Sequence, residues 1–105
     1  MDRKLPPLHP GKVIEENLKA LKLSVPKAAS ILSVSKQHLY RVAQGKNSIT
    51  PDLAYRIGKL FGNGSRFWLN LQTQYDVFHI EQDYLTNPKK KSIADNIMCI
   101  GSHVI

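Results

Sequence analysis

The sequence predicts an all-α domain of five helices followed by a short C-terminal tail. Apolar residues recur at intervals of three and four along most of the chain, which is the spacing of one helix face. Residues that favour helix starts precede several of these stretches, and glycines follow them. The alternation typical of strands is almost absent. We therefore expect a single small domain, at residues 11–82, between an arm at residues 1–10 and a tail at residues 83–105.

The first predicted helix begins near Gly11, directly after Pro10. One face carries mainly apolar side chains, at Val13, Ile14, Asn17, Leu18 and Leu21. The opposite face is charged, with Lys12, Glu15, Glu16 and Lys19. This amphipathic pattern predicts a helix that covers the core with one side only.

Residues 24–45 have the pattern of two short helices separated by a tight turn. Ser24 and Ser35 precede the two helices, and each can accept a hydrogen bond from a backbone amide that lacks an intrahelical partner. Each helix has one face of small and aliphatic residues, with Ala28, Ala29 and Leu32 in the first and Leu39, Val42 and Ala43 in the second. These faces are expected to bury each other, and Gly45 can adopt the left-handed conformation that ends helices. The layout is that of a helix-turn-helix, whose second helix enters the DNA major groove.

Two more helices are expected after this pair. Thr50, Pro51 and Asp52 form a strong start signal, and Leu53, Ile57 and Leu60 follow on one face. Residues 62–64 break this helix, and Ser65 is expected to cap the last one. The last helix carries an aromatic stripe at Trp68, Leu71, Tyr75 and Phe78. These four side chains are candidates either for the core or for the interface of a two-fold dimer.

The formal net charge of +7 is concentrated in the predicted DNA-binding region. Residues 24–62 contain only one carboxylate, Asp52, against six basic side chains. They are Lys27, Lys36, Arg41, Lys46, Arg56 and Lys59. A polyanion is therefore attracted to the same segment whose helix pattern indicates a DNA reader.

Other classes of function fit the residues less well. Cys99 is the only cysteine, so an internal disulfide and a cysteine-rich zinc site are excluded. The four histidines stand in no metal-ligand spacing, and we expect no metal, no cofactor and no catalytic residues. A ribonuclease that uses His38, Tyr40 and Arg41 is the enzyme alternative, although these residues belong to a predicted exposed helix. No apolar run approaches the roughly 18 to 20 residues that span a membrane, so a cytoplasmic protein is expected.

Three further stretches carry a family resemblance: HPGKVIEENL, ITPDLA and FWLNLQ. With the helix pair, over about residues 8–82, they resemble the HigA-type antitoxins of the Xre or Cro/C1-type (lambda repressor-like) helix-turn-helix superfamily. The resemblance implies a homodimer that binds double-stranded operator DNA, represses its own operon and neutralises a toxin. That toxin is typically an mRNA-cleaving ribonuclease of the RelE-like fold, of the HigB type. A stand-alone or phage-type repressor without a toxin, and a toxin inhibitor that no longer binds DNA, are the alternatives.

The resemblance also implies roles for individual residues. Lys36, Gln37 and Arg41, with Tyr40 beside them, take the base-reading role, which suits the chemistry of their side chains toward guanine and adenine. The candidates for phosphate contact are Ser24, Ser35, Gln44, Lys46 and Asn47. The alternative is that all of these are ordinary solvated residues of a helical protein.

The chain departs from the family pattern at two positions, and its tail is a segment for which the sequence predicts no single structure. Ser33 stands in the turn where the family favours glycine, and it is strained there if φ is positive. Val25 replaces a common glutamine and removes a side-chain contact to phosphate, so lower operator affinity is expected. In the tail, residues 87–91 resemble a linker. Ile93, Ile97 and Ile100 share helical spacing, but residues 97–105 fit a strand or a segment that folds on a partner equally well. A toxin-binding tail and a loosely packed end are the two hypotheses for residues 83–105.

Overall fold

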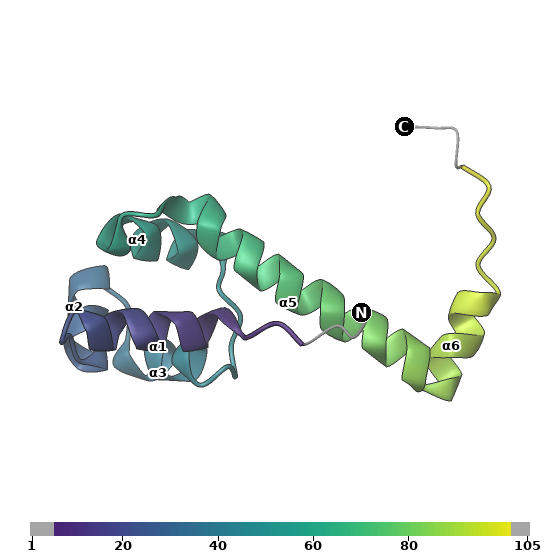
Figure 1. Cartoon of the computed structure of the whole chain (residues 1–105), viewed down its shortest axis with the longest axis horizontal. Coiled ribbons are helices and arrows are strands. Elements are labelled where there is room, and N and C mark those ends of the chain that lie inside the picture. Colours follow the sequence, from purple (N-terminus) through teal and green to yellow (C-terminus); the bar gives the residue numbers. More distant parts are fainter. Residues whose placement is uncertain (1–5, 102–105) are drawn as a thin grey trace.

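The computed structural model describes residues 6–101 and forms six α-helices over that range (Figure 1). They are α1 (Pro10–Ala20), α2 (Val25–Leu32), α3 (Lys36–Ala43), α4 (Pro51–Phe61), α5 (Gly64–Thr86) and α6 (Pro88–Asp95). The described range contains no strand, so the all-α class is confirmed. The prediction of five helices was wrong by one. The parts of the predicted arm and tail at residues 1–5 and 102–105 lie outside the described residues.

The additional helix, α6, begins inside residues 87–91, the segment that was expected to be a linker, and continues to Asp95. The side chain of Asn87 caps it by accepting hydrogen bonds from the backbone amides of Lys89 and Lys90, and Pro88 takes the first helical position. The Lys90 ammonium also pairs with the Asp83 carboxylate of α5. A cap and an ion pair therefore fold a lysine-rich stretch whose composition alone indicated a linker.

The core lies between α1, α2, α3, α4 and the first half of α5. Its buried apolar side chains are Ile14, Leu18, Ala28, Ala29, Leu32, Leu39, Val42, Ile49, Leu53, Ala54, Ile57 and Trp68. The predicted faces of α2 and α3 are thus buried, except that Ala43 is only half-buried. None of the helices among residues 6–101 is long and apolar enough to cross a membrane.

Two helix pairs touch through their backbones. A Cβ atom at Gly11 of α1 would lie 1.9 Å from the carbonyl oxygen of Val42 in α3. A Cβ atom at Gly58 of α4 would lie 2.4 Å from the carbonyl carbon of Gly64, the first residue of α5. Both distances are far below contact, so only glycine fits. Gly11 therefore fixes how closely α3 approaches the rest of the fold.

The helix-turn-helix forms with the predicted caps and with a strained turn. The hydroxyls of Ser24 and Ser35 accept hydrogen bonds from the backbone amides of Lys27 and His38, at 3.2 and 3.1 Å. Ser33 ends α2 with φ at 58°, in the left-handed region, which is the condition under which the sequence predicted strain at this position. Arg56 of α4 holds this turn, because its Nη1 donates to the carbonyl oxygens of Leu32 and Ser33.

Replacing Ser33 with glycine is expected to stabilise the protein by about 0.5–1 kcal/mol. The left-handed conformation costs a residue with a side chain about 1–2 kcal/mol, and the greater freedom of glycine in the unfolded chain cancels part of that gain. Urea unfolding measures the change. Ser30→Gly is the control, because Ser30 is exposed inside α2 and glycine there is expected to destabilise by about 0.5 kcal/mol. A loss of stability in Ser33→Gly would contradict the strain.

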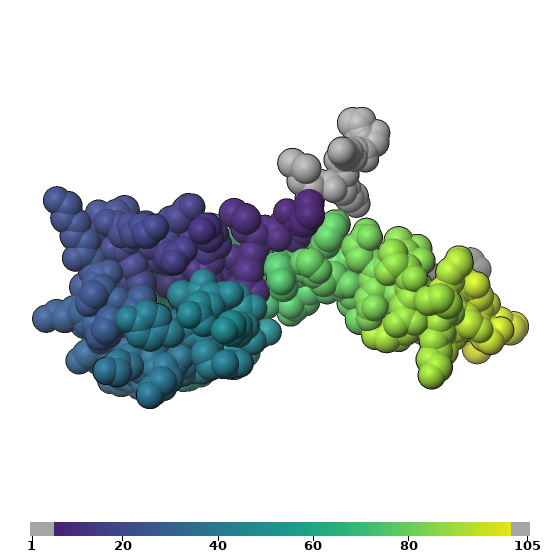
Figure 2. Space-filling view, turned by 90° about the horizontal axis from the view of Figure 1, so that it is seen from below, coloured from purple at the N-terminus to yellow at the C-terminus, as the bar shows by residue number. Residues whose placement is uncertain are grey.

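The long helix α5 begins one residue before the predicted cap. Ser65 was expected to cap it, but α5 starts at Gly64, and its N-cap residue Asn63 makes no capping hydrogen bond. The side-chain oxygen of Asn63 instead accepts a 2.7 Å hydrogen bond from the indole Nε1 of Trp68. The helix then continues past residue 82 to Thr86. Its second half and α6 stand away from the body formed by the first four helices (Figures 1 and 2).

Candidate nucleic-acid interface

One face of α3 is buried and the other is free. Leu39 and Val42 have no exposed surface, whereas the four predicted base-reading side chains are all exposed. Those four are Lys36, Gln37, Tyr40 and Arg41. The candidate interface is thus the exposed face of one helix, which carries long polar side chains, while the opposite face packs against the core.

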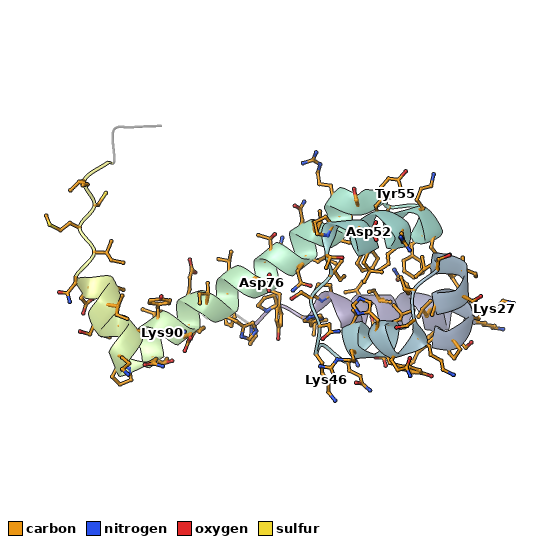
Figure 3. The ribbon with its side chains drawn as sticks, turned by 180° about the vertical axis from the view of Figure 1, so that it is seen from behind. Lys27, Lys46, Asp52, Tyr55, Asp76 and Lys90 are labelled. Carbon is orange, nitrogen blue, oxygen red and sulfur yellow. The ribbon has the colours of Figure 1, made fainter. Side chains whose placement is uncertain are left out.

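The predicted phosphate-contacting residues surround this face. Ser24 and Ser35 are exposed at the starts of α2 and α3, where their hydroxyls serve as caps. Gln44 and Lys46 are exposed just after α3, and Asn47 is half-buried. Lys46 points away from the body, on the side opposite Asp52 and Tyr55 of α4 (Figure 3). Polar side chains therefore border α3 at both ends.

The six basic side chains of residues 24–62 are not all on this face. Lys27, Lys36, Arg41 and Lys46 are exposed on α2, α3 or the loop that follows. Arg56 lies on α4, where its Nε pairs with Asp52 at 3.2 Å and its Nη1 holds the α2–α3 turn. Lys59 is also on α4, 6.0 Å from the ring centre of Tyr55. Charge counting had included these two cations, and one of them has a structural role.

The loop after α3 folds back onto the helix. Gly45 has a φ of 79°, in the left-handed region that the sequence predicted for it. The turn lets the amides of Lys46 and Asn47 donate to the carbonyl oxygen of Arg41, at 2.8 and 3.3 Å. The side-chain oxygen of Asn47 then accepts a 3.2 Å hydrogen bond from Nε of Arg41. Sequence reasoning did not anticipate this contact between two of its candidates.

A second fixed point of this loop is Gln72, which sequence reasoning missed. Gln72 is the one buried polar side chain among the described residues, with 5% of its surface exposed. Its Oε1 accepts a 2.8 Å hydrogen bond from the Ile49 amide, and its Nε2 donates to Asp76 at 3.0 Å. The available signal was its position four residues after Trp68, on the buried face of a helix. Gln72 ties the loop to α5.

His9 lies beside Gly45 of this loop, since a Cβ atom at Gly45 would lie 3.5 Å from Cγ of His9. Its Nδ1 caps α1 by accepting from the Gly11 amide at 2.9 Å, and its ring packs against Tyr75 at a centroid distance of 4.8 Å. Burial lowers the pKa of His9 below its ordinary value of 6.5, and the Asp76 carboxylate opposes part of that shift. A neutral imidazole accepts the hydrogen bond of the cap, and a protonated one cannot.

We expect the free energy of unfolding to decrease as the pH is lowered, because of His9. The pKa of His9 is lower in the folded than in the unfolded chain, so its stabilising contribution is complete above pH 6.5. That contribution is lost as the pH falls through the lower, folded value. Urea unfolding between pH 8 and 5 measures the effect against His9→Asn, which keeps a capping side chain but does not titrate. Parallel pH profiles for the two proteins would contradict it.

The aromatic stripe of α5 divides between two environments. Trp68 has no exposed surface, so it belongs to the core of the protomer, and Leu71, Tyr75 and Phe78 are half-buried. Four other apolar side chains of this helix are more exposed: Phe67, Val77, Ile80 and Leu85. Exposed apolar side chains outside the predicted stripe are therefore also present on this helix.

The solved structures similar to this chain include one complex with promoter DNA. An addiction module antidote protein of the HigA family from Coxiella burnetii is 34% identical, with a TM-score of 0.74, and the match covers 91% of this chain and all of that one. The antitoxin HigA of Pseudomonas aeruginosa, solved with the higBA promoter, is 29% identical with a TM-score of 0.74, over 90% of this chain and 98% of that one. Virulence-associated protein I of Dichelobacter nodosus is 39% identical over 80 residues, 75% of this chain and 74% of its own. No protein-family model matches. These relatives are described as antitoxins and a virulence-associated protein, and none is described as an enzyme.

Proposed function

The chain belongs to the HigA family of helix-turn-helix antitoxins, and we propose that it represses its own operon and neutralises a partner toxin. The observation that carries the DNA-binding half of this proposal is the exposed face of α3, with Lys36, Gln37, Tyr40 and Arg41. The promoter complex of the Pseudomonas relative supports it.

In the proposed complex α3 lies in the major groove. Arg41 or Lys36 contacts guanine O6 and N7, and Gln37 contacts adenine, since these are the side chains whose donors and acceptors match those base edges. Lys46 and the start of α2 contact phosphates and set the position of α3 without reading sequence. Sequence selectivity and affinity then come from different residues, which mutation separates.

The proposed assembly on DNA is a homodimer. Two copies of α3 about 34 Å apart reach successive faces of the major groove, which is how two-fold readers bind palindromic operators. The exposed apolar side chains of α5 support this, because Val77, Ile80 and Leu85 remain outside the core of one protomer. The half-buried Leu71, Tyr75 and Phe78 adjoin them on the same helix.

The proposed toxin is a HigB-type ribonuclease of the RelE-like fold that cleaves mRNA. This part of the proposal rests on family membership. It predicts a small reading frame of about 90–110 codons beside this one, whereas a stand-alone repressor would lack that neighbour.

The first experiment is a titration of the purified protein with the DNA upstream of its reading frame and with scrambled DNA of equal length, each at two salt concentrations. A preference of about a thousandfold or more, with steep salt dependence, is the expected result. Equal and weak binding to both DNAs would overturn repression and leave toxin neutralisation as the leading function.

The second experiment tests the toxin. The product of the neighbouring reading frame is mixed with an mRNA, with and without this protein, and the protein is expected to stop cleavage at equimolar concentration. Deleting residues 88–105 then tests the tail hypothesis, because unchanged toxin affinity would place the contact elsewhere. Cleavage that continues in the presence of excess protein would overturn neutralisation.

A further inference from the structure

Asn47 has both ends of its side-chain amide occupied inside the protein. Its Oδ1 accepts from Nε of Arg41 at 3.2 Å, and its Nδ2 lies 3.4 Å from Nδ1 of His38. The guanidinium of arginine only donates, so the amide oxygen must face Arg41 and the amide nitrogen must face His38. These contacts favour a role for Asn47 in intramolecular hydrogen bonding over the phosphate contact that was expected for it.

The backbone that carries Asn47 is itself fixed at two points. The amides of Lys46 and Asn47 donate to the carbonyl oxygen of Arg41, and the Ile49 amide donates to the buried Gln72. The loop therefore cannot drift relative to α3 without breaking hydrogen bonds to both α3 and α5. Asn47 presents its oxygen to Arg41 from a rigid support.

Only one nitrogen of Arg41 is engaged. Within residues 6–101, Nη1 and Nη2 of Arg41 make no hydrogen bond, while Nε donates to Asn47. The two terminal nitrogens can together contact O6 and N7 of a guanine. A long side chain held at Nε loses less freedom when it binds, so a fixed Arg41 binds its base more tightly than a free one.

We propose that Asn47 is a positioning residue: it holds the Arg41 guanidinium by its Nε–H and leaves the terminal nitrogens free for a base. The DNA consequence rests on the proposed function, in which Arg41 reads the operator. The hydrogen bond between Asn47 and Arg41 does not rest on the proposed function, because it is present in the protein without DNA.

The first arm of the test needs no DNA. NMR relaxation of the arginine Nε–H groups in the free protein reports how ordered each guanidinium is on the picosecond to nanosecond timescale. Arg41 is expected to be more ordered than the exposed Arg66 of α5 and to lose that order in Asn47→Ala. Asn47→Asp is expected to retain it, because a carboxylate oxygen also accepts from Nε. Equal mobility of Arg41 and Arg66 in the wild type would overturn the proposal.

The second arm is a double-mutant cycle on the ratio of affinities for upstream and scrambled DNA. Asn47→Ala is expected to lower the ratio about two- to tenfold, the factor for ordering one long side chain at an interface. In the Arg41→Ala background, adding Asn47→Ala is expected to have no further effect, so the double variant and Arg41→Ala have the same ratio of affinities. Asn70→Ala, an exposed asparagine of α5, is the matched control.

The outcomes separate the two ideas. A loss of ratio in Asn47→Ala that is as large without Arg41 as with it would overturn the positioning role and return Asn47 to a direct DNA contact. A wild-type protein with no preference for the upstream DNA would overturn base reading, and the NMR arm would still decide whether Asn47 holds Arg41.

Discussion

Replacing Arg41 with alanine is expected to abolish most of the preference for operator DNA while weakening binding to scrambled DNA far less. A bidentate contact to guanine is worth about 1–3 kcal/mol, and a two-fold dimer loses two of them, so the specific affinity should fall roughly 30-fold or more. Arg41 is exposed on α3, and its terminal nitrogens have no partner among residues 6–101. Titrations with upstream and scrambled DNA measure both losses.

Lys46→Ala is the matched control for Arg41→Ala, because it removes the same charge from the loop after α3. As a phosphate contact, Lys46 should affect both DNAs alike and should lower the slope of log affinity against log salt by about one per protomer. Equal losses on the two DNAs for Arg41→Ala would contradict base reading by that residue.

Replacing Gly11 with alanine is expected to be the most damaging single-methyl change in the described chain. The added Cβ would lie 1.9 Å from the carbonyl oxygen of Val42, so α1 and α3 must separate. Overpacking of this kind costs about 1–3 kcal/mol or more, and each kcal/mol lowers the melting temperature of a domain this size by about 4–8 °C. Thermal unfolding followed by circular dichroism measures the change.

The control for Gly11→Ala is Gly101→Ala, where the added methyl group meets no atom within 4 Å. That variant should melt within about 1 °C of the wild type, since surface changes away from packed features have small effects. Because Gly11 fixes how closely α1 and α3 pack, Gly11→Ala should also shift α3. At a temperature where the variant remains folded, it should therefore bind upstream DNA more weakly, with a smaller loss for scrambled DNA. An unchanged melting temperature would show that the two helices slide apart without cost.

The sequence was sufficient for three helix starts whose signals are local. Ser24, Ser35 and Thr50 all cap the helices that were expected to follow them, because a cap is a contact between residues three apart. The positive φ of Gly45 and of Ser33 could likewise be anticipated from turn chemistry and from the family resemblance. Such features are decided within one turn of chain.

The features that sequence reasoning missed at Asn63, Gln72 and Arg56 depend on side-chain contacts, two of which join residues far apart in the sequence. Asn63 was not identified as the start of α5, because its side chain serves the Trp68 indole instead of the helix amides. The contact from Gln72 to the Ile49 amide joins residues 23 apart, and the Arg56 contact to Leu32 joins residues 24 apart. Neither spacing belongs to one helix, so no periodicity could indicate it.

The candidate site was predictable as a list of residues but not as an arrangement. The exposed face of α3 followed from helical spacing, since Leu39 and Val42 had to turn inward. The link from Asn47 to Arg41 required the backbone turn at Gly45, which brings a residue six positions later back beside the helix. Side chains that were assigned to phosphate and to base as independent contacts are therefore physically connected.

The buried residues of α5 end at Gln72, and this divides the protein into two parts that are expected to unfold differently. Beyond Gln72 no residue up to 101 is buried, so the second half of α5 and α6 are held by their own hydrogen bonds, half-buried contacts and the Lys90–Asp83 pair. Backbone amides in such a segment are expected to open locally, at a free energy well below that of global unfolding, whereas those of the buried residues of α1 to α4 are expected to open mainly with the whole core. One end of the molecule is thus a rigid platform for α3, and the other is a helix whose persistence depends on what packs against it.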